Sequence, residues 1–165
     1  MNERSENRIV HPIEPVFDEN SRILILGSFP SVKSRESGFF YGHKQNRFWK
    51  IMSRICGEDT PSTNEDKKAF LLRNKIALWD VIHSCEICGS SDSSIKNAVP
   101  NDLSRIINNS DIRAVFTNGK TAYKLYQKYN NTLKAVYLPS TSPANASWSE
   151  EKLYNFWKKQ IDVYL

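Results

Sequence analysis

The stretch from Arg22 to Trp49, RILILGSFPSVKSRESGFFYGHKQNRFW, determines how the rest of the chain is organised. It opens on the aliphatic run 23–26, which has the length and composition of a buried strand and stops at a Gly-Ser-Phe-Pro turn. Small hydroxyls, aromatic rings and cations follow this turn. Because open α/β sheets bind ligands beyond the carboxyl ends of their strands, the stretch predicts a buried strand followed by a binding site.

Short apolar runs and stretches of helical periodicity alternate along the remaining chain. We expect further strands at 75–82, 111–116 and 135–138, and helices at 46–57, 65–74, 100–107, 121–129 and 149–165. The residues before Ser21 include two prolines and predict an extended arm, and 89–97 predicts a serine-rich loop that covers the site. The alternation favours an α/β protein, a three-layer α/β/α sandwich with a central four-stranded, mostly parallel sheet, in a single domain over residues 1–165.

The composition limits the partners and the location of the protein. The 165 residues carry a net charge of +5 and a pI near 9.1, which suits nucleic acid but is also common on solvated surfaces. The chain has no apolar run of about eighteen residues, so we expect no membrane span. Its first residues, MNERSENR, lack the apolar segment of a secretory signal, so we expect a cytoplasmic protein. We also expect a monomer.

The cysteines give little evidence of a metal or redox site. Cys85 and Cys88 have the C-x-x-C spacing that zinc, iron–sulfur and redox sites use, but no second pair and no nearby histidine pair complete four ligands. We therefore expect reduced thiols, and neither a metal nor another cofactor.

Each predicted strand ends in a polar turn. The four turns are Gly27-Ser28, 80–84, 117–119 and 140–142. In a parallel sheet these ends lie along one edge, so we expect the polar residues of the turns to gather in one cleft.

Five sequence blocks carry a specific resemblance. The blocks GSFPS, YGHKQNRFW, LWDVIHSC with GSSDSSI, TNGKTA and LPSTSPAN, in this order between Ile23 and Asn145, resemble the uracil-DNA glycosylase superfamily, and most closely its hypoxanthine (deoxyinosine) branch. The resemblance implies hydrolysis of the N-glycosidic bond of a flipped, damaged base in DNA. Flipping costs a few kcal/mol, which stacking, hydrogen bonds to the base edge and phosphate contacts must return.

The same resemblance implies two catalytic residues. Uracil-type relatives place an Asp or Asn two residues after the opening glycine, where this chain has Phe29, whose ring cannot orient a water. The resemblance to the hypoxanthine branch gives that role to Asn46, through its carbonyl oxygen rather than as a general base. The alternative is that Asn46 only caps the following helix. His43 is the second candidate, as a donor to a phosphate, the sugar or the leaving base, or as a structural histidine.

A second group of residues is expected to bind the flipped base. It comprises Gly27, Ser28, Phe29, Phe40, Tyr41 and Asp80. Tyr41 and Phe40 are candidates to stack on the base with Phe29 behind them, although such rings also pack in cores. Asp80 corresponds to an Asn that reads the base edge in relatives, so its carboxylate is expected either to accept a hydrogen bond from a ring N–H or to hold the loop around Ser84.

A third group, rich in hydroxyls, is expected to bind DNA, with 140–142 at a phosphate and Asn145 at the wedge position that fills the vacated stack. It comprises Ser31, Ser34, Lys120, Ser140, Thr141, Ser142 and Asn145. No lysine is positioned for a Schiff base, so we expect a monofunctional glycosylase acting on hypoxanthine, with uracil or xanthine as the other candidate bases. The alternatives are a non-catalytic nucleic-acid or nucleotide binder on the same fold and, ranked last, an RNA-binding protein.

Overall fold

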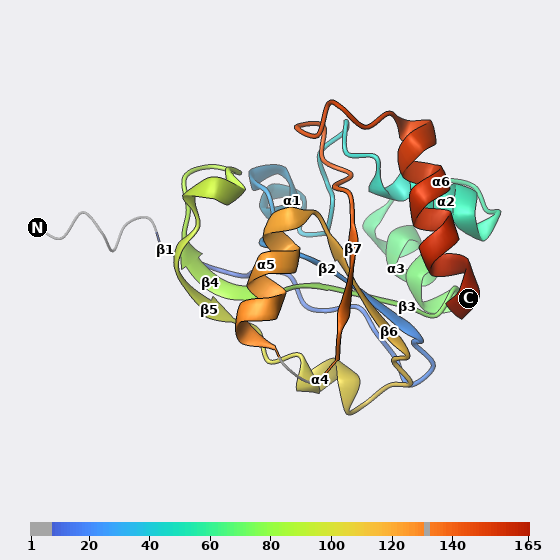
Figure 1. Cartoon of the computed structure of the whole chain (residues 1–165), viewed down its shortest axis with the longest axis horizontal. Helices are drawn as coiled ribbons and strands as arrows, with labels where there is room; N and C mark the ends of the chain where they lie inside the picture. Colours follow the sequence, from blue (N-terminus) through green and yellow to red (C-terminus); the bar gives the residue numbers. More distant parts are fainter. Residues whose placement is uncertain (1–7, 131–132) are drawn as a thin grey trace, which may run out of the picture.

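A sheet of four parallel strands forms the centre of the computed structural model, which describes residues 8–130 and 133–165 (Figure 1). The strand order is β3-β2-β6-β7, and the strands are β2 (Ile23–Gly27), β3 (Ile76–Asp80), β6 (Ala114–Asn118) and β7 (Ala135–Leu138). β2 and β3 are buried along their whole length, as expected of parallel strands covered on both faces. The register pairs Gly27 with Asp80 and Asn118 with Leu138, so the strands end together at one edge.

Helices cover both faces of this sheet, which confirms the predicted sandwich. The helix α5 (Lys120–Tyr129) lies on one side, and α2 (Phe48–Cys56), α3 (Asn64–Arg73) and α6 (Glu150–Ile161) gather on the other (Figure 1). The amphipathic α6 begins at Ser149, whose side chain accepts a hydrogen bond from the Lys152 amide, and buries Leu153, Trp157 and Ile161. The shorter helical segments are α1 (Val32–Ser37), α4 (Ser104–Ile107), η1 (Asp92–Ser94) and η2 (Asp162–Tyr164).

A second sheet, which the sequence did not predict, lies at one end of the molecule. It is antiparallel, in the order β1-β4-β5, and consists of β1 (Arg8–Val10), β4 (Ile82–Glu86) and β5 (Lys96–Pro100). The prediction of one strand over 75–82 was therefore wrong, and so was the prediction of a helix starting at Pro100. The strand β6 also lies later than the predicted 111–116.

Asn101 explains why the chain can change sheets after Asp80. The Asn101 side-chain amide donates to the carbonyls of Asp80 and Ile82 at 2.9 and 3.1 Å, and its backbone N–H donates to the Val81 carbonyl at 2.8 Å. These bonds satisfy backbone groups that a neighbouring strand would otherwise satisfy. The parallel strand therefore ends at Asp80, and the next strand continues in the small sheet.

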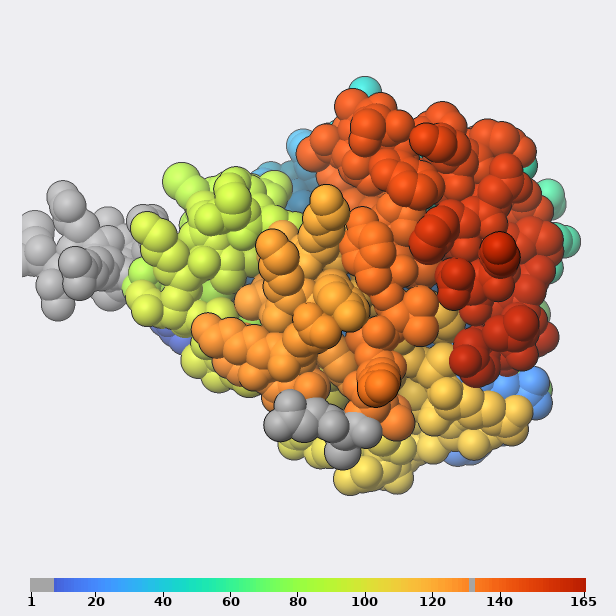
Figure 2. Space-filling model, viewed as in Figure 1, coloured from blue at the N-terminus to red at the C-terminus, as the bar shows by residue number. Residues whose placement is uncertain are grey.

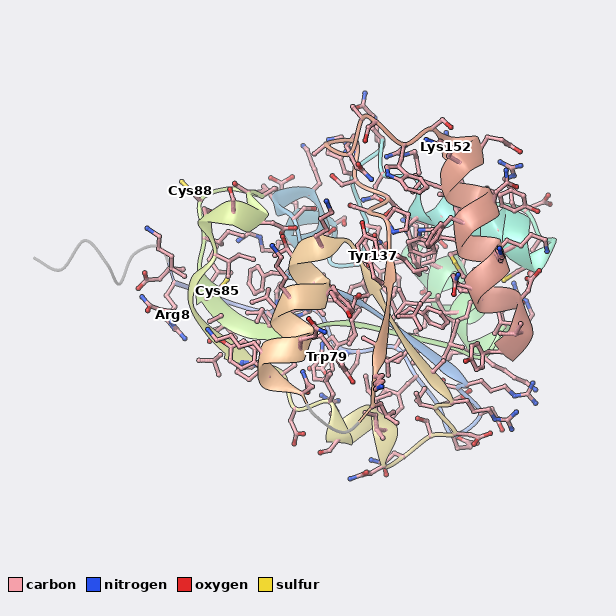
Figure 3. The ribbon with its side chains drawn as sticks, viewed as in Figure 1. Arg8, Trp79, Cys85, Cys88, Tyr137 and Lys152 are labelled. Atoms are coloured by element: carbon pink, nitrogen blue, oxygen red, sulfur yellow. The ribbon has the colours of Figure 1, made fainter. Side chains whose placement is uncertain are left out.

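The small sheet stands beside α5 at the amino-terminal end of the molecule (Figure 2). Cys85 is buried there and Cys88 is exposed, and both are free thiols (Figure 3). Within residues 8–130 and 133–165, no group of three or more His, Cys, Asp or Glu residues could hold a metal ion. None of the helices in that part of the chain is long and apolar enough to cross a membrane.

Candidate active site

A cavity of about 400 Å³ opens at the carboxyl edge of the parallel sheet. Most of the residues expected from the sequence line it: Gly27, Ser28, Phe29, Ser31, Ser34, Phe40, Tyr41, His43, Asn46, Asp80, Ser140, Thr141 and Ser142. Among the lining residues that the sequence did not single out for the site are Ser90, Asp92 and Asn118. Lys120, exposed in the first turn of α5, and Asn145 are not among the lining residues.

Asp80 forms a buried pair with His11, a residue of the amino-terminal arm that sequence reasoning missed. The His11 Nε2 atom lies 2.7 Å from Asp80 Oδ2, and the side chains are 2% and 5% exposed. The other carboxylate oxygen, Oδ1, faces Gly27, where an added Cβ would clash with it. Gly27 is therefore required for this close approach of the carboxylate to the backbone.

Tyr41 lies beside the same point and has an unusual backbone conformation. Its φ is +52°, its ring stacks on Phe48 with centroids 4.2 Å apart, and its hydroxyl lies 3.2 Å from the position of a Cβ on Gly27. The hydroxyl is buried and has no hydrogen-bond partner in the described part of the chain. Burial and, secondarily, the Asp80 charge raise the pKa of Tyr41, and the Asn118 side chain, which is close to the hydroxyl but outside hydrogen-bond geometry, lowers it in part. The phenol therefore stays protonated and can donate a hydrogen bond.

Two other aromatic rings of the predicted base site are buried in the core. Phe40 is 1% exposed and its carbonyl accepts a hydrogen bond from Trp49 Nε1. Phe29 is 7% exposed and meets the His11 ring edge-on, with centroids 5.8 Å apart. Core packing, the alternative considered for these rings, describes Phe40 better than stacking on a base.

Asn46 belongs to a directional chain of hydrogen bonds with Thr141 and Asn118. The Thr141 N–H donates to Asn118 Oδ1 at 3.0 Å, so Asn118 Nδ2 donates in turn to Thr141 Oγ1 at 3.0 Å. Thr141 Oγ1 then donates to Asn46 Oδ1 at 2.8 Å, and the Phe48 N–H donates to the same oxygen at 3.0 Å. Both lone pairs of the Asn46 carbonyl are used.

This network shows which atoms of Asn46 already have partners. Its carbonyl oxygen accepts from the Phe48 N–H at the start of α2 and from the Thr141 hydroxyl, and the water-orienting role expected of that oxygen stays a prediction. Backbone N–H groups donate only, so the Phe48 and Thr141 amides fix the orientation of both Asn side chains. The group that Asn46 has left for a ligand is its amide Nδ2, a hydrogen-bond donor.

His43 also lines the cavity, with a tautomer set by its neighbour. The Gln45 N–H donates to His43 Nδ1 at 3.1 Å, so Nδ1 accepts and the ring proton resides on Nε2. His43 also lines a more open hollow of about 710 Å³ next to the cavity, together with Lys33 and Lys44.

The serine-rich loop brings a second carboxylate to the cavity. Ser28 Oγ donates to Asp92 Oδ1 at 2.7 Å, which joins the first turn to η1. Desolvation raises the pKa of Asp92, the Ser28 hydrogen bond lowers it in part, and the Asp80 charge raises it further.

Arg47 fixes the loop that follows β7, a role that no sequence pattern indicates. Its guanidinium donates to four backbone carbonyls of that loop, those of Thr141, Ser142, Asn145 and Trp148. The Asn145 side chain is also used within the loop, where its Nδ2 donates to the Ser140 carbonyl at 3.0 Å. The loop is therefore held in one conformation over the cavity.

Ser31 and Ser34 form the turn that supports α1. Ser31 caps this helix through the Ser34 N–H, and Ser34 Oγ accepts from the Gly42 N–H at 3.0 Å. Ser34 is only 2% exposed, so its hydroxyl holds the turn and the expected contact with DNA does not fit this geometry.

The fold and the cleft together define the class, an α/β/α sandwich protein whose ligand enters at the carboxyl edge of a parallel sheet. The sequence pattern of the family described as "Uracil DNA glycosylase superfamily" matches residues 14–162. The chain therefore belongs to this superfamily, as the resemblance of its sequence blocks indicated.

Individual relatives agree with this membership. A hypoxanthine DNA glycosylase of Methanosarcina barkeri is 41% identical over 79% of this chain and 85% of that protein. A hypoxanthine DNA glycosylase of Methanosarcina acetivorans is 35% identical over 83% of this chain and 89% of that protein. A solution NMR structure of a proposed uracil DNA glycosylase from Methanosarcina acetivorans is similar with a TM-score of 0.74 and 31% identity, covering 92% of this chain and 98% of that one.

Proposed function

We propose that this protein is a monofunctional DNA glycosylase that accepts a flipped, deaminated base in the cavity and hydrolyses its N-glycosidic bond, with hypoxanthine as the preferred base. The observation that carries the proposal is that a carboxylate oxygen of Asp80 and the unpartnered hydroxyl of Tyr41 both lie beside Gly27. Hypoxanthine has a ring N–H next to a C=O. The N–H donates to Asp80 Oδ1, and the C=O accepts from the Tyr41 hydroxyl.

The preference for hypoxanthine among such bases is supported by two relatives that are named hypoxanthine DNA glycosylase. Uracil and xanthine carry the same N–H and C=O edge, so the Asp80 and Tyr41 pair alone does not distinguish the three bases. The net charge of +5 favours the DNA backbone as a binding partner.

In the proposed reaction the bond between C1′ and the base breaks with its electron pair moving to the base, and the sugar gains oxocarbenium character. The water that attacks C1′ needs positioning more than activation, because this carbon is strongly electron-poor. Its oxygen forms the new bond to C1′, and the proton that it loses ends on the departing base, which leaves as the neutral free base. We assign Asn46 Nδ2 to hold the water by donating to its oxygen, and His43 Nε2–H to donate to the departing base. No lysine lines the 400 Å³ cavity in the described part of the chain, which favours water over an amine as the nucleophile.

Base release from labelled duplexes carrying inosine, uracil or xanthine tests the proposal. The native protein should release hypoxanthine fastest. Asn46→Asp keeps both acceptor contacts of Oδ1 but removes the amide donor, so it should remain folded and lose release. Asn46→Ala is the matched variant that removes both groups, and it should also be less stable.

The outcomes separate the parts of the proposal. If the native protein binds all three duplexes and releases no base, it is a non-catalytic nucleic-acid binder and the glycosylase proposal fails. If Asn46→Asp is as active as the native protein, the donor role of Asn46 fails.

A further inference from the structure

We propose that His11 is a positioning residue that determines which hydrogen-bonding group Asp80 presents to the base, and hence that the cavity selects hypoxanthine over adenine and uracil over cytosine. This inference rests on the proposed function and extends it to a residue outside the cavity. His11 is not among the cavity-lining residues and acts only through Asp80.

The hydrogen bonds of the His11 ring assign its tautomer. The Ile13 N–H donates to His11 Nδ1 at 3.2 Å, so Nδ1 has no proton and accepts. The ring proton of the neutral imidazole is therefore on Nε2, which donates to Asp80 Oδ2 at 2.7 Å. His11 is thus a donor toward residue 80, and whatever occupies that position must offer it an acceptor.

The contacts of His11 hold its ring in this orientation. Its backbone N–H donates to the His83 carbonyl at 2.7 Å, which fixes the arm against β4. The ring meets Phe29, Phe40 and Trp79 with centroid distances of 5.8, 6.1 and 6.4 Å. Trp79, labelled in Figure 3, is the residue of β3 directly before Asp80, and it is buried.

Because His11 Nε2 is always a donor, it determines which side-chain atom of residue 80 faces the cavity. With aspartate, His11 occupies Oδ2 and the remaining oxygen, Oδ1, is an acceptor beside Gly27. With asparagine at position 80, His11 Nε2 would donate to the amide oxygen, and the NH₂ group would face the cavity. Hypoxanthine and uracil present a ring N–H there, whereas their amino parents adenine and cytosine present a ring nitrogen lone pair. An acceptor at this point therefore favours hypoxanthine over adenine and uracil over cytosine.

Three variants test this role: Asp80→Asn, His11→Phe and the double variant of both. In Asp80→Asn the amide donor meets the N–H donor of hypoxanthine, so release should fall about 100-fold or more. In the double variant the phenyl ring cannot donate, so the introduced amide can rotate its oxygen toward the base. Hypoxanthine release should then recover by about 10-fold or more relative to Asp80→Asn alone. His11→Phe alone should be inactive, because it leaves the buried carboxylate without its donor.

A merely structural histidine would not give this rescue, since replacing it could only add damage. If Asp80→Asn and the double variant are both folded and equally impaired, His11 does not set the orientation of residue 80 and the inference fails. If Asp80→Asn releases hypoxanthine at the native rate, Asp80 does not read the base. Failure of the native protein to release any base is the separate outcome that removes the proposed function itself.

The tautomer provides a test that needs neither activity nor a variant. In a ¹⁵N NMR spectrum of the histidine-labelled native protein, His11 should show a protonated Nε2 and an unprotonated Nδ1. A charged His11, or a proton on Nδ1, would overturn the inference.

Discussion

Replacing Thr141 by valine is the sharpest test of the network that orients Asn46. Valine has nearly the shape of threonine, but it can neither donate nor accept a hydrogen bond. Thr141 is fully buried, and its hydroxyl accepts from Asn118 Nδ2 and donates to Asn46 Oδ1. The substitution therefore removes two hydrogen bonds and leaves the space filled.

The loss of stability depends on which hydrogen bonds Asn118 and Asn46 retain in the variant. Asn118 Nδ2 loses a buried acceptor, whereas Asn46 Oδ1 keeps the Phe48 N–H. Leaving a buried polar group unpaired costs about 1–3 kcal/mol, so we expect about 2–4 kcal/mol in total, with the smaller share at Asn46. For a domain of this length that is a fall in melting temperature of about 5–15 °C. The loosened Asn46 amide should also slow base release by about 10–100-fold.

Thermal denaturation and single-turnover release of hypoxanthine from an inosine duplex measure the two effects. Thr141→Ser keeps the hydroxyl and serves as the matched control, with native-like release expected. A valine variant that melts and reacts like the native protein would refute both the hydrogen-bond network and its part in positioning Asn46.

Two further predictions concern the loop after β7 and the carboxylate of η1. Arg47→Met removes the donor to four loop carbonyls, so amide hydrogen exchange over 142–148 should quicken by about 10-fold or more while the sheet stays protected. Unchanged exchange in Arg47→Met would show that these hydrogen bonds do not hold the loop. Asp92 is exposed as a residue, but desolvation of its carboxyl group raises its folded-state pKa, so its contribution to stability is present below the unfolded pKa and lost as pH rises through the folded value. The Asp92→Asn variant should therefore melt at a higher temperature than the native protein at pH 8, and this difference should disappear toward pH 4. A difference in melting temperature that grows toward pH 4 would show that the carboxylate is not desolvated.

The parallel sheet could be predicted because its evidence is local. The run 23–26 and the run 135–138 are each an apolar segment ended by a polar turn, and both are strands in the structure. The same reasoning predicted that the four turns lie at one edge of the sheet, and the cavity lies at that edge. The second sheet could not be predicted this way, because the apolar run 75–82 continues through the point where the chain changes sheets. The Asn101 hydrogen bonds that permit this change join residues about 20 positions apart.

Most residues that line the candidate site could be predicted from the sequence, but the hydrogen bonds between them could not. Asn46 and Asp80 are in the cavity, yet the partners that fix them are Thr141 and His11, at sequence separations of 95 and 69 residues. A local sequence pattern does not indicate which distant side chain will donate to a given oxygen atom. The Thr141 and Phe48 contacts of the Asn46 carbonyl could therefore not be predicted, and His11, in its proline-flanked arm, carries no local signal of its role.

The arrangement of the small sheet has a consequence for how the nascent chain matures. All three of its strands, and the Asn101 hydrogen bonds that fix Asp80, come from residues 8–101, whereas β6, Asn118 and the loop around Thr141 are synthesised later. Because β6 pairs directly with β2 in the parallel sheet and a domain folds as a unit, both walls of the cavity should form together, after the loop around Thr141 has been synthesised.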